Sequence, residues 1–102
     1  MQSGTVNLLM VFKALSDPIR MKILEALPSN REENGAWNVS ELASHLKVPQ
    51  PTVSHHLGIL RNAGLVGFRK SCRDVYYWRD REFFESVLEG LHDQFGKGDR
   101  IG

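Results

Sequence analysis

Residues 49–66, PQPTVSHHLGILRNAGLV, form the stretch that decides the fold of this chain. Its large apolar side chains recur at the spacing of one helical face: Val53, Leu57 and Leu60. Pro51 suits the first turn of a helix, and Gly64 suits the position just after the last turn. The pattern predicts a helix over about 51–63 with one buried side and one outward polar side.

A shorter predicted helix, over about 39–46, precedes this one and opens with a capping box. Asn38 is the N-cap, and Glu41 is placed to accept a hydrogen bond from the Asn38 backbone amide. The tight turn KVP, residues 47–49, joins the two helices. Two helices joined in this way are typical of a helix-turn-helix, here about 39–63, whose second helix enters the major groove of DNA.

The rest of the chain adds three helices and a β-hairpin to this unit. Apolar periodicity predicts the helices over about 6–15, 18–27 and 81–95. Residues 65–79 hold two runs rich in Val, Phe, Tyr and Trp around a polar tip at 70–74, which is typical of a hairpin. Residues 28–38 are polar and aperiodic, so we expect a surface loop there. We therefore predict one domain over residues 1–102, a mainly α (α+β) winged helix with five helices and a two-stranded wing.

Composition agrees with this prediction. The chain has 102 residues, of which 41% are hydrophobic and 25% are charged, as in ordinary globular domains. No apolar run approaches the roughly 20 residues that cross a bilayer, and the start lacks the basic segment of a signal peptide. The single cysteine, Cys72, excludes an intrachain disulfide and a CxxC metal site. We expect a cytoplasmic protein with no membrane association.

Charge is divided unevenly along the chain, although the net charge is only +1. Residues 50–79 contain five basic side chains and one acidic side chain, whereas residues 80–95 contain one basic and five acidic side chains. The first of these segments can approach a polyanion such as DNA, and the second cannot.

The outward side of the second helix carries side chains suited to base edges and phosphates: Gln50, Thr52, Ser54 and His55. Arg61 follows near the end of the helix. The wing adds three cations that can lie along the DNA backbone or enter a minor groove: Arg69, Lys70 and Arg73. These eight residues are the candidate DNA-binding set. For His55, the simpler interpretation is an ordinary exposed side chain.

His56 should point about 60° from the buried direction of the same helix. We expect it to be half-buried beside Leu60 and to form a local hydrogen bond. Adjacent positions of a helix point about 100° apart, so His55 and His56 are poorly placed to chelate one metal ion.

Three segments resemble the ArsR-type winged-helix transcriptional repressors in their order and spacing: FKALSDPIRMKILEAL, VSELASHLKVPQPTVSHHLGILRNAGLV and RDVYYW. The resemblance covers roughly residues 9–93. It implies a homodimer that binds a pseudo-palindromic operator in double-stranded DNA and is released by an inducer or by oxidation. It also implies that the first and last helices form the dimer interface, which in this chain comprises Leu8, Val11, Phe12, Phe84, Val87, Leu88 and Leu91.

The usual metal sites of that family are absent or degraded in this sequence. Members that sense arsenic, cadmium or lead carry a cysteine pair on the helix that matches 39–46, which has no cysteine here. Members that sense zinc, nickel or cobalt often use an Asp-x-His pair, but residues 80–82 read DRE, and His92 has no His or Glu three residues later. Gly58 stands where relatives often place a lysine, which removes a phosphate contact. We predict no metal and no cofactor, and leave the inducer open.

Three alternatives follow from the residues. Glu85, Glu89 and His92 form an i, i+4, i+7 stripe that would suit zinc across a dimer, or a solvated acidic face. Cys72, between basic residues, would suit a redox-active thiol or an ordinary exposed cysteine. The predicted function is a DNA-binding repressor and not an enzyme, because no catalytic constellation can be assembled from these motifs. The alternative is a winged-helix protein-interaction module that has lost DNA binding.

Overall fold

The computed structural model describes residues 7–29 and 36–96, which form five helices and one antiparallel hairpin. In chain order the elements are α1 (Leu8–Leu15), α2 (Pro18–Ala26), α3 (Val39–Leu46), α4 (Gln50–Asn62), β1 (Val66–Ser71), β2 (Asp74–Arg79) and α5 (Arg81–Phe95). This order confirms the predicted α+β winged helix. The predicted bounds agree within one or two residues, although the expected helix start at residue 6 lies outside the described residues.

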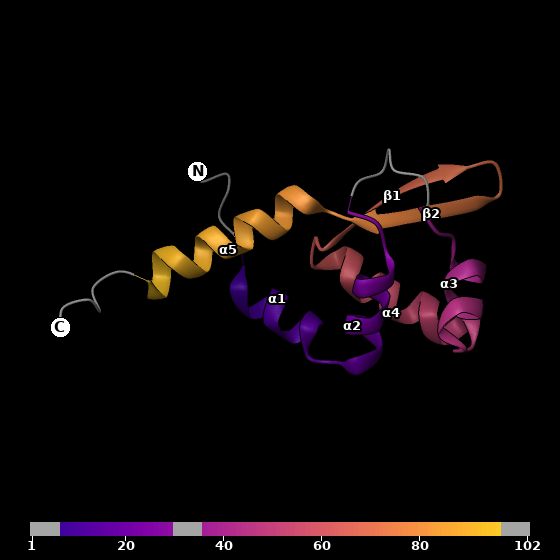
Figure 1. Cartoon of the computed structure of the whole chain (residues 1–102), viewed down its shortest axis with the longest axis horizontal. Helices are drawn as coiled ribbons and strands as arrows, with labels where there is room; N and C mark the ends of the chain where they lie inside the picture. The colour runs from indigo at the N-terminus through magenta and orange to yellow at the C-terminus, as the bar shows by residue number, and fades with distance from the viewer. Residues whose placement is uncertain (1–6, 30–35, 97–102) are drawn as a thin grey trace.

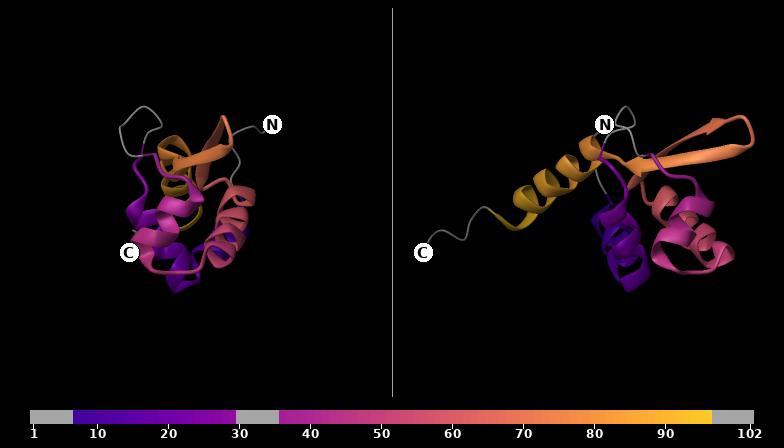
Figure 2. Two further views of the ribbon diagram at one scale, coloured as in Figure 1. Left: turned by 90° about the vertical axis from the view of Figure 1, so that its right-hand side faces the viewer. Right: turned by 45° about the vertical axis from the view of Figure 1, so that its right-hand side comes forward.

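The molecule is elongated because α5 extends away from the other elements (Figure 1). Its extents are 52, 25 and 22 Å. The wing and the α3–α4 pair lie at the end of the molecule opposite the free end of α5, and a second view shows the hairpin projecting in that direction (Figure 2). The helix-turn-helix and the wing therefore present one common end to a partner.

One apolar core joins all five helices to both strands of the wing. Its largest side chains, each less than 2% exposed, are Ile23, Leu27, Leu42, Leu57, Leu60, Leu65, Val11 and Val53. The three buried residues of α4 are the ones predicted from its periodicity. Burial of a Val or Leu side chain contributes roughly 1.5–3 kcal/mol, so these residues determine which side of α4 faces the core.

The helix starts follow from side chains that accept backbone N–H bonds. The predicted capping box of α3 is present: Asn38 Oδ1 accepts from the Glu41 amide at 2.8 Å, and Glu41 Oε1 accepts from the Asn38 amide at 3.0 Å. Asp17 caps α2 and is followed by Pro18 in the first turn, and Asp80 caps α5. These caps satisfy amides that the helices themselves leave unpaired.

The hairpin tip is shorter than the predicted segment 70–74. Strand pairing continues through Lys70–Val75 and Ser71–Asp74, which leaves only Cys72 and Arg73 in the turn. Cys72 has a φ of 58°, as two-residue hairpin turns require for a right-handed strand twist. The polar composition of the tip concealed this pairing, because exposed strand ends are also polar.

The end of the predicted loop 28–38 contributes to the wing. Trp37 forms an antiparallel bridge with Tyr77, in which the two backbone N···O distances are 3.3 and 2.9 Å. A one-residue bridge has no alternating pattern, so periodicity could not reveal it. The bridge ties the chain before α3 to β2; residues 30–35 of the loop lie outside the described residues.

Gly67 and Gly58 offer a matched pair of alanine substitutions. A Cβ at Gly67 would lie 2.5 Å from Nε1 of Trp78, whereas a Cβ at Gly58 would meet no described atom within 4 Å. We expect Gly67→Ala to lower the free energy of unfolding by roughly 1–3 kcal/mol, because the indole must shift. We expect Gly58→Ala to raise it by up to about 1 kcal/mol, because alanine favours a helix. Urea denaturation measures both, and the reverse order of stability would contradict this packing.

Candidate nucleic-acid interface

The outward face of α4 presents the side chains that the sequence predicted for base contacts. Gln50, Ser54 and His55 are exposed, and Thr52 is half-buried. They occupy the first half of the helix, opposite its buried residues. The structure therefore brings these four side chains together on one part of α4. In a helix-turn-helix, the first half of the second helix is the part that reaches base edges.

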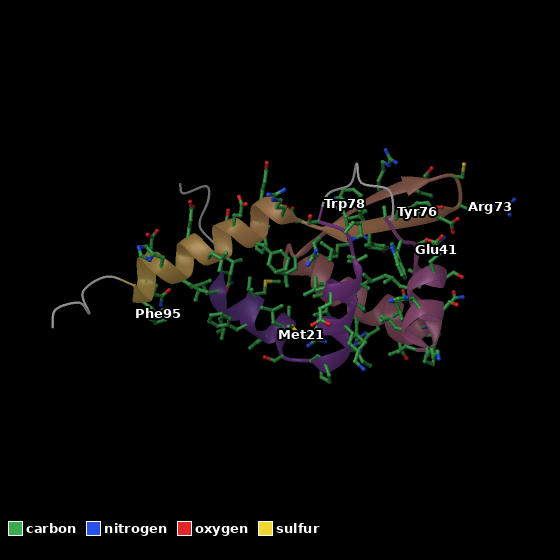
Figure 3. The ribbon with its side chains drawn as sticks, viewed as in Figure 1. Met21, Glu41, Arg73, Tyr76, Trp78 and Phe95 are labelled. Atoms are coloured by element: carbon green, nitrogen blue, oxygen red, sulfur yellow. The ribbon has the colours of Figure 1, made fainter. Side chains whose placement is uncertain are left out.

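The predicted cations extend this surface from α4 onto the wing. Arg69, Lys70 and Arg73 are all exposed. Arg73 lies at the far tip of the hairpin and points away from the body, whereas Phe95 marks the opposite end of the molecule (Figure 3). The three side chains give the wing a positive surface that can lie along phosphates.

Arg61 has a contact that the sequence did not suggest. Its guanidinium carbon lies 3.6 Å from the centre of the Phe68 ring on β1. A cation–π contact at an exposed site contributes about 0.5–1 kcal/mol. The contact holds the last turn of α4 to the wing while Arg61 remains exposed. Phe68 is exposed on β1, so its ring is open to the guanidinium of Arg61.

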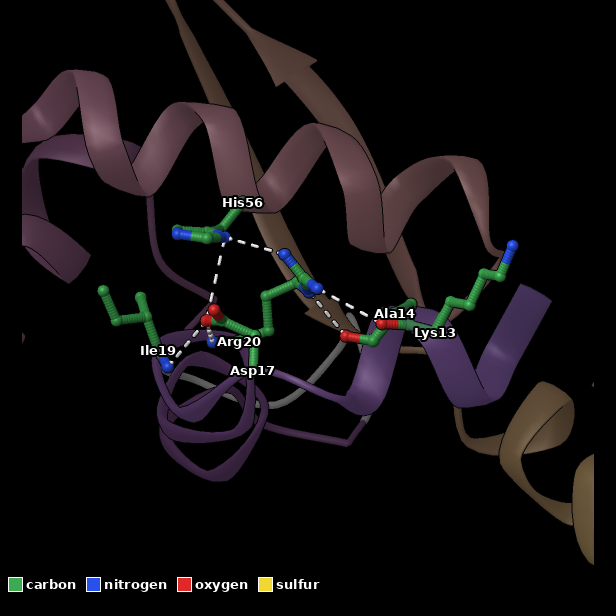
Figure 4. Close-up of polar contacts among 6 residues, drawn as sticks. All are labelled: Lys13, Ala14, Asp17, Ile19, Arg20 and His56. Carbon is green, nitrogen blue, oxygen red and sulfur yellow. Dashed lines mark hydrogen bonds and ion pairs between the residues drawn. The ribbon is translucent and has the colours of Figure 1, made fainter. Parts of the chain in front are cut away.

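His56 is half-buried as predicted, but its hydrogen bond is not local. Its side chain is 12% exposed. Nδ1 lies 3.1 Å from Nη1 of Arg20 on α2 and 3.9 Å from Oδ2 of Asp17 at the start of that helix (Figure 4). The partner is 36 residues away in the chain, beyond the reach of an argument from helical spacing.

Arg20 was not among the predicted site residues. It occupies the first turn of α2, where the helix dipole opposes a positive charge. This unfavourable position could have indicated from the sequence that Arg20 contacts another element, because a cation held there needs acceptors from outside its own helix.

The Asp17 carboxylate connects this group to the fold. It accepts hydrogen bonds from the backbone amides of Arg20 and Ile19, at 3.1 and 2.9 Å. The amide of Arg20 is the main cause that holds the pKa of Asp17 below its ordinary value of 3.8. Partial burial acts against this shift, while the Ile19 amide, the charge of Arg20 and, in its protonated form, His56 act with it.

The acidic stripe on α5 does not converge on a metal position within one chain. Throughout residues 7–29 and 36–96, no group of three His, Cys, Asp or Glu side chains is close enough to hold an ion. Glu85 lies instead 3.7 Å from Nε of Arg81, in an exposed i, i+4 pair. Cys72 is exposed at the wing tip. None of the described helices is long and apolar enough to cross a membrane.

The residues expected at a dimer interface divide into three groups by their exposure. Val11 and Val87 are only 1% and 7% exposed, so they belong to the core of the single chain, because α1 and α5 also contact each other within it. Phe12 and Leu88 are 41% and 65% exposed. The remaining three are half-buried: Leu8, Phe84 and Leu91. Three further apolar side chains of these helices are exposed and were not predicted: Leu9, Met10 and Phe95.

A helix-turn-helix followed by a hairpin, with a polar outward face on the second helix, defines a winged helix-turn-helix domain. Residues 17–67 match the family described as bacterial regulatory protein, arsR family. The chain belongs to this family and is a DNA-binding transcriptional regulator.

Similar proteins support this assignment over most of the chain. The transcriptional repressor SdpR of Bacillus subtilis is 32% identical over 89 residues, which cover 87% of this chain and 93% of SdpR. The transcriptional activator HlyU of Vibrio cholerae is 32% identical over 92 residues, which cover 90% and 81% of the two chains. The solved structure of an ArsR-like transcriptional regulator from Rhodococcus sp. RHA1 superposes with a TM-score of 0.78 at 30% identity and covers 91% of this chain and 83% of its own.

Asp17→Asn keeps an oxygen that can cap α2 but removes the charge. Because the pKa of Asp17 lies below 3.8 in the folded state, its ionised form stabilises the fold above pH 3.8, and this contribution is lost as the pH falls through the lowered pKa. We expect the variant to be less stable than the wild type at neutral pH and equally stable in strong acid. Urea denaturation across this pH range measures the difference. Asp93→Asn on α5 is the control, and a pH-independent gap for Asp17→Asn would contradict the assignment.

Proposed function

We propose that the chain is a sequence-specific transcriptional repressor that binds a pseudo-palindromic operator as a homodimer, without the metal sites usual in its family. The observation that carries this proposal is the outward face of α4 beside the cationic wing. Short polar side chains stand where a helix-turn-helix reads the major groove, and exposed cations flank them. We also propose a cytoplasmic location, where the operator lies.

The chemistry of each side chain suggests its role. Gln50 can form a bidentate pair with adenine, and Ser54 and His55 can donate to or accept from base edges. Thr52, half-buried, suits a phosphate or a thymine methyl group at the margin. The cations suit the DNA backbone: Arg61, Arg69, Lys70 and Arg73. The position of Arg73 at the wing tip supports a contact with the DNA backbone or with a neighbouring minor groove.

The exposed apolar surface of α1 and α5 supports a homodimer. Leu88, Leu9 and Phe12 would remain in contact with water in an isolated chain, and α5 projects beyond the body of the molecule (Figure 1). A second copy would cover this surface. Two-fold symmetry would then place two α4 helices on half-sites about 34 Å apart, one turn of DNA.

A protein-interaction module that has lost DNA binding is the second candidate. One observation favours it: Gly58 leaves the middle of the exposed face of α4 without a side chain, so no phosphate or base contact can be made there. The two candidates differ in how they respond to salt. Counterion release makes DNA binding fall steeply with salt concentration.

The experiment that tests the proposal is selection of bound DNA from a random library. A repressor of this kind should enrich an inverted repeat and lower transcription from a promoter that contains the repeat. Because SdpR is named a repressor and HlyU an activator, the reporter decides the sign of regulation. No enrichment, together with no salt-sensitive binding in gel shifts, would favour the interaction module.

Arg73→Ala should weaken binding to all DNA sequences. Loss of one phosphate contact makes the slope of log affinity against log salt less negative by about 0.9. Ser54→Ala should instead cost roughly 1–3 kcal/mol on the selected operator and alter its base preference. Fluorescence anisotropy across a salt series measures both. Arg81→Ala, an exposed arginine on α5, is the matched control. An unchanged slope for Arg73→Ala would exclude its proposed contact.

Leu88→Glu should convert a dimer into monomers. The substitution replaces an apolar side chain, which is 65% exposed in the single chain and buried in the proposed interface, with a charged one. Sedimentation equilibrium measures the association, and operator affinity should fall with it. Ser44→Glu, exposed on α3, is the control for added charge in the sedimentation measurement. A Leu88→Glu chain that still dimerises would place the interface elsewhere.

A further inference from the structure

Arg20 joins three helices through one guanidinium group. From α2 it donates through Nε to the carbonyl oxygen of Ala14 and through Nη2 to that of Lys13, the latter at 3.2 Å (Figure 4). Its Nη1 lies 3.1 Å from Nδ1 of His56 on α4. The side chain therefore spans from the end of α1 to the middle of α4.

The contact with α1 holds the guanidinium in place. Ala14 and Lys13 lie in the last turn of α1, where backbone carbonyls have no partner within the helix and the dipole favours a cation. Two donors of a rigid planar fork are engaged there, so the direction of the third is set. That third donor points at α4.

The contact with α4 depends on the protonation of His56. A guanidinium can only donate, so Nδ1 of His56 must accept and must carry no proton. If Nδ1 took up a proton, it would lose this bond and would instead be attracted to Oδ2 of Asp17, which lies 3.9 Å away. The charged or titratable groups that face the imidazole are therefore Asp17 and Arg20 from α2, and His55 on α4, whose ring centre is 5.2 Å distant.

His56 lies beside the residues proposed to read DNA. Ser54 and His55 precede it on the exposed side, whereas Leu57 follows it in the core. The apolar residues hold only the buried side of α4. The hydrogen bond between Arg20 and His56 holds the helix at a second position and so limits its rotation about its own axis. If α4 rotated about its axis, the side chains proposed to contact bases would move relative to the groove.

We propose that Arg20 is a positioning residue for DNA recognition, which fixes α4 to the end of α1 through His56 while Nδ1 of His56 is unprotonated. This inference rests on the proposed function, in which α4 reads the operator. It adds a residue that touches no DNA, and it makes operator selectivity sensitive to pH.

Two substitutions of His56 distinguish the hydrogen bond to Arg20 from a role in which the side chain only fills space. His56→Asn places its amide near the position of Nδ1 and can still accept from Arg20. His56→Gln places its amide near the position of Nε2 and cannot make the same bond. A hydrogen bond to a charged group is worth enough to change an equilibrium about tenfold. We expect the ratio of operator affinity to random-DNA affinity to fall about tenfold in His56→Gln and less than about twofold in His56→Asn.

The pH profile provides a readout that a packing role would not move. As the pH is lowered until Nδ1 of His56 takes up a proton, the affinity ratio of the wild type should fall toward that of His56→Gln. The ratio of His56→Asn should fall less, because asparagine does not take up a proton. His55 and all other titratable groups are the same in both proteins, so the difference between the two profiles belongs to His56. Thermal unfolding confirms that each variant is folded; if His56→Gln is not, the wild type and His56→Asn still give the comparison of profiles.

The outcomes distinguish this inference from the proposed function. A wild-type chain without salt-sensitive DNA binding would overturn both. Wild-type binding with equal affinity ratios for the two folded variants, or with identical pH profiles for the wild type and His56→Asn, would overturn the positioning role alone. Arg20→Lys, which keeps the charge but lacks the fork, should behave like His56→Gln.

Discussion

The structure depends on the burial of one face of α4. Val53, Leu57 and Leu60 are almost completely removed from water by the helices packed around them. A helix with one buried stripe has only one orientation that keeps its polar side outward. The helix-turn-helix, the position of the wing after Gly64 and the choice of which side of α4 faces outward all follow from this constraint.

Charge and apolar surface are separated along the same molecule. The cationic wing and the polar face of α4 lie at one end, and the acids and exposed apolar side chains of α5 extend toward the other (Figure 3). A polyanion is attracted to the first region and repelled by the second. This arrangement matches a family of DNA-binding regulators and leaves the α1–α5 surface for a protein partner, proposed to be a second copy.

Prediction from the sequence succeeded where the cause was local. The capping box at Asn38, the helix stop at Gly64 and the buried stripe of α4 each depend on residues within a few positions of one another. It failed where the cause was distant. The Trp37–Tyr77 bridge, the placement of Arg61 over Phe68 and the bond between Arg20 and His56 join separate elements, and no periodicity records them.

The terminal helices show the same limit. Their apolar stripes were evident from spacing, but spacing does not tell which side faces the chain itself and which faces a partner, so Val11 and Val87 were assigned to an interface although they lie in the core. The sequence by itself determined the elements, their order and the polar character of the outward face of α4, because short-range sterics, caps and periodicity act within one segment. Only the tertiary structure decided which distant side chains meet, because those contacts arise when separate helices pack around a shared core.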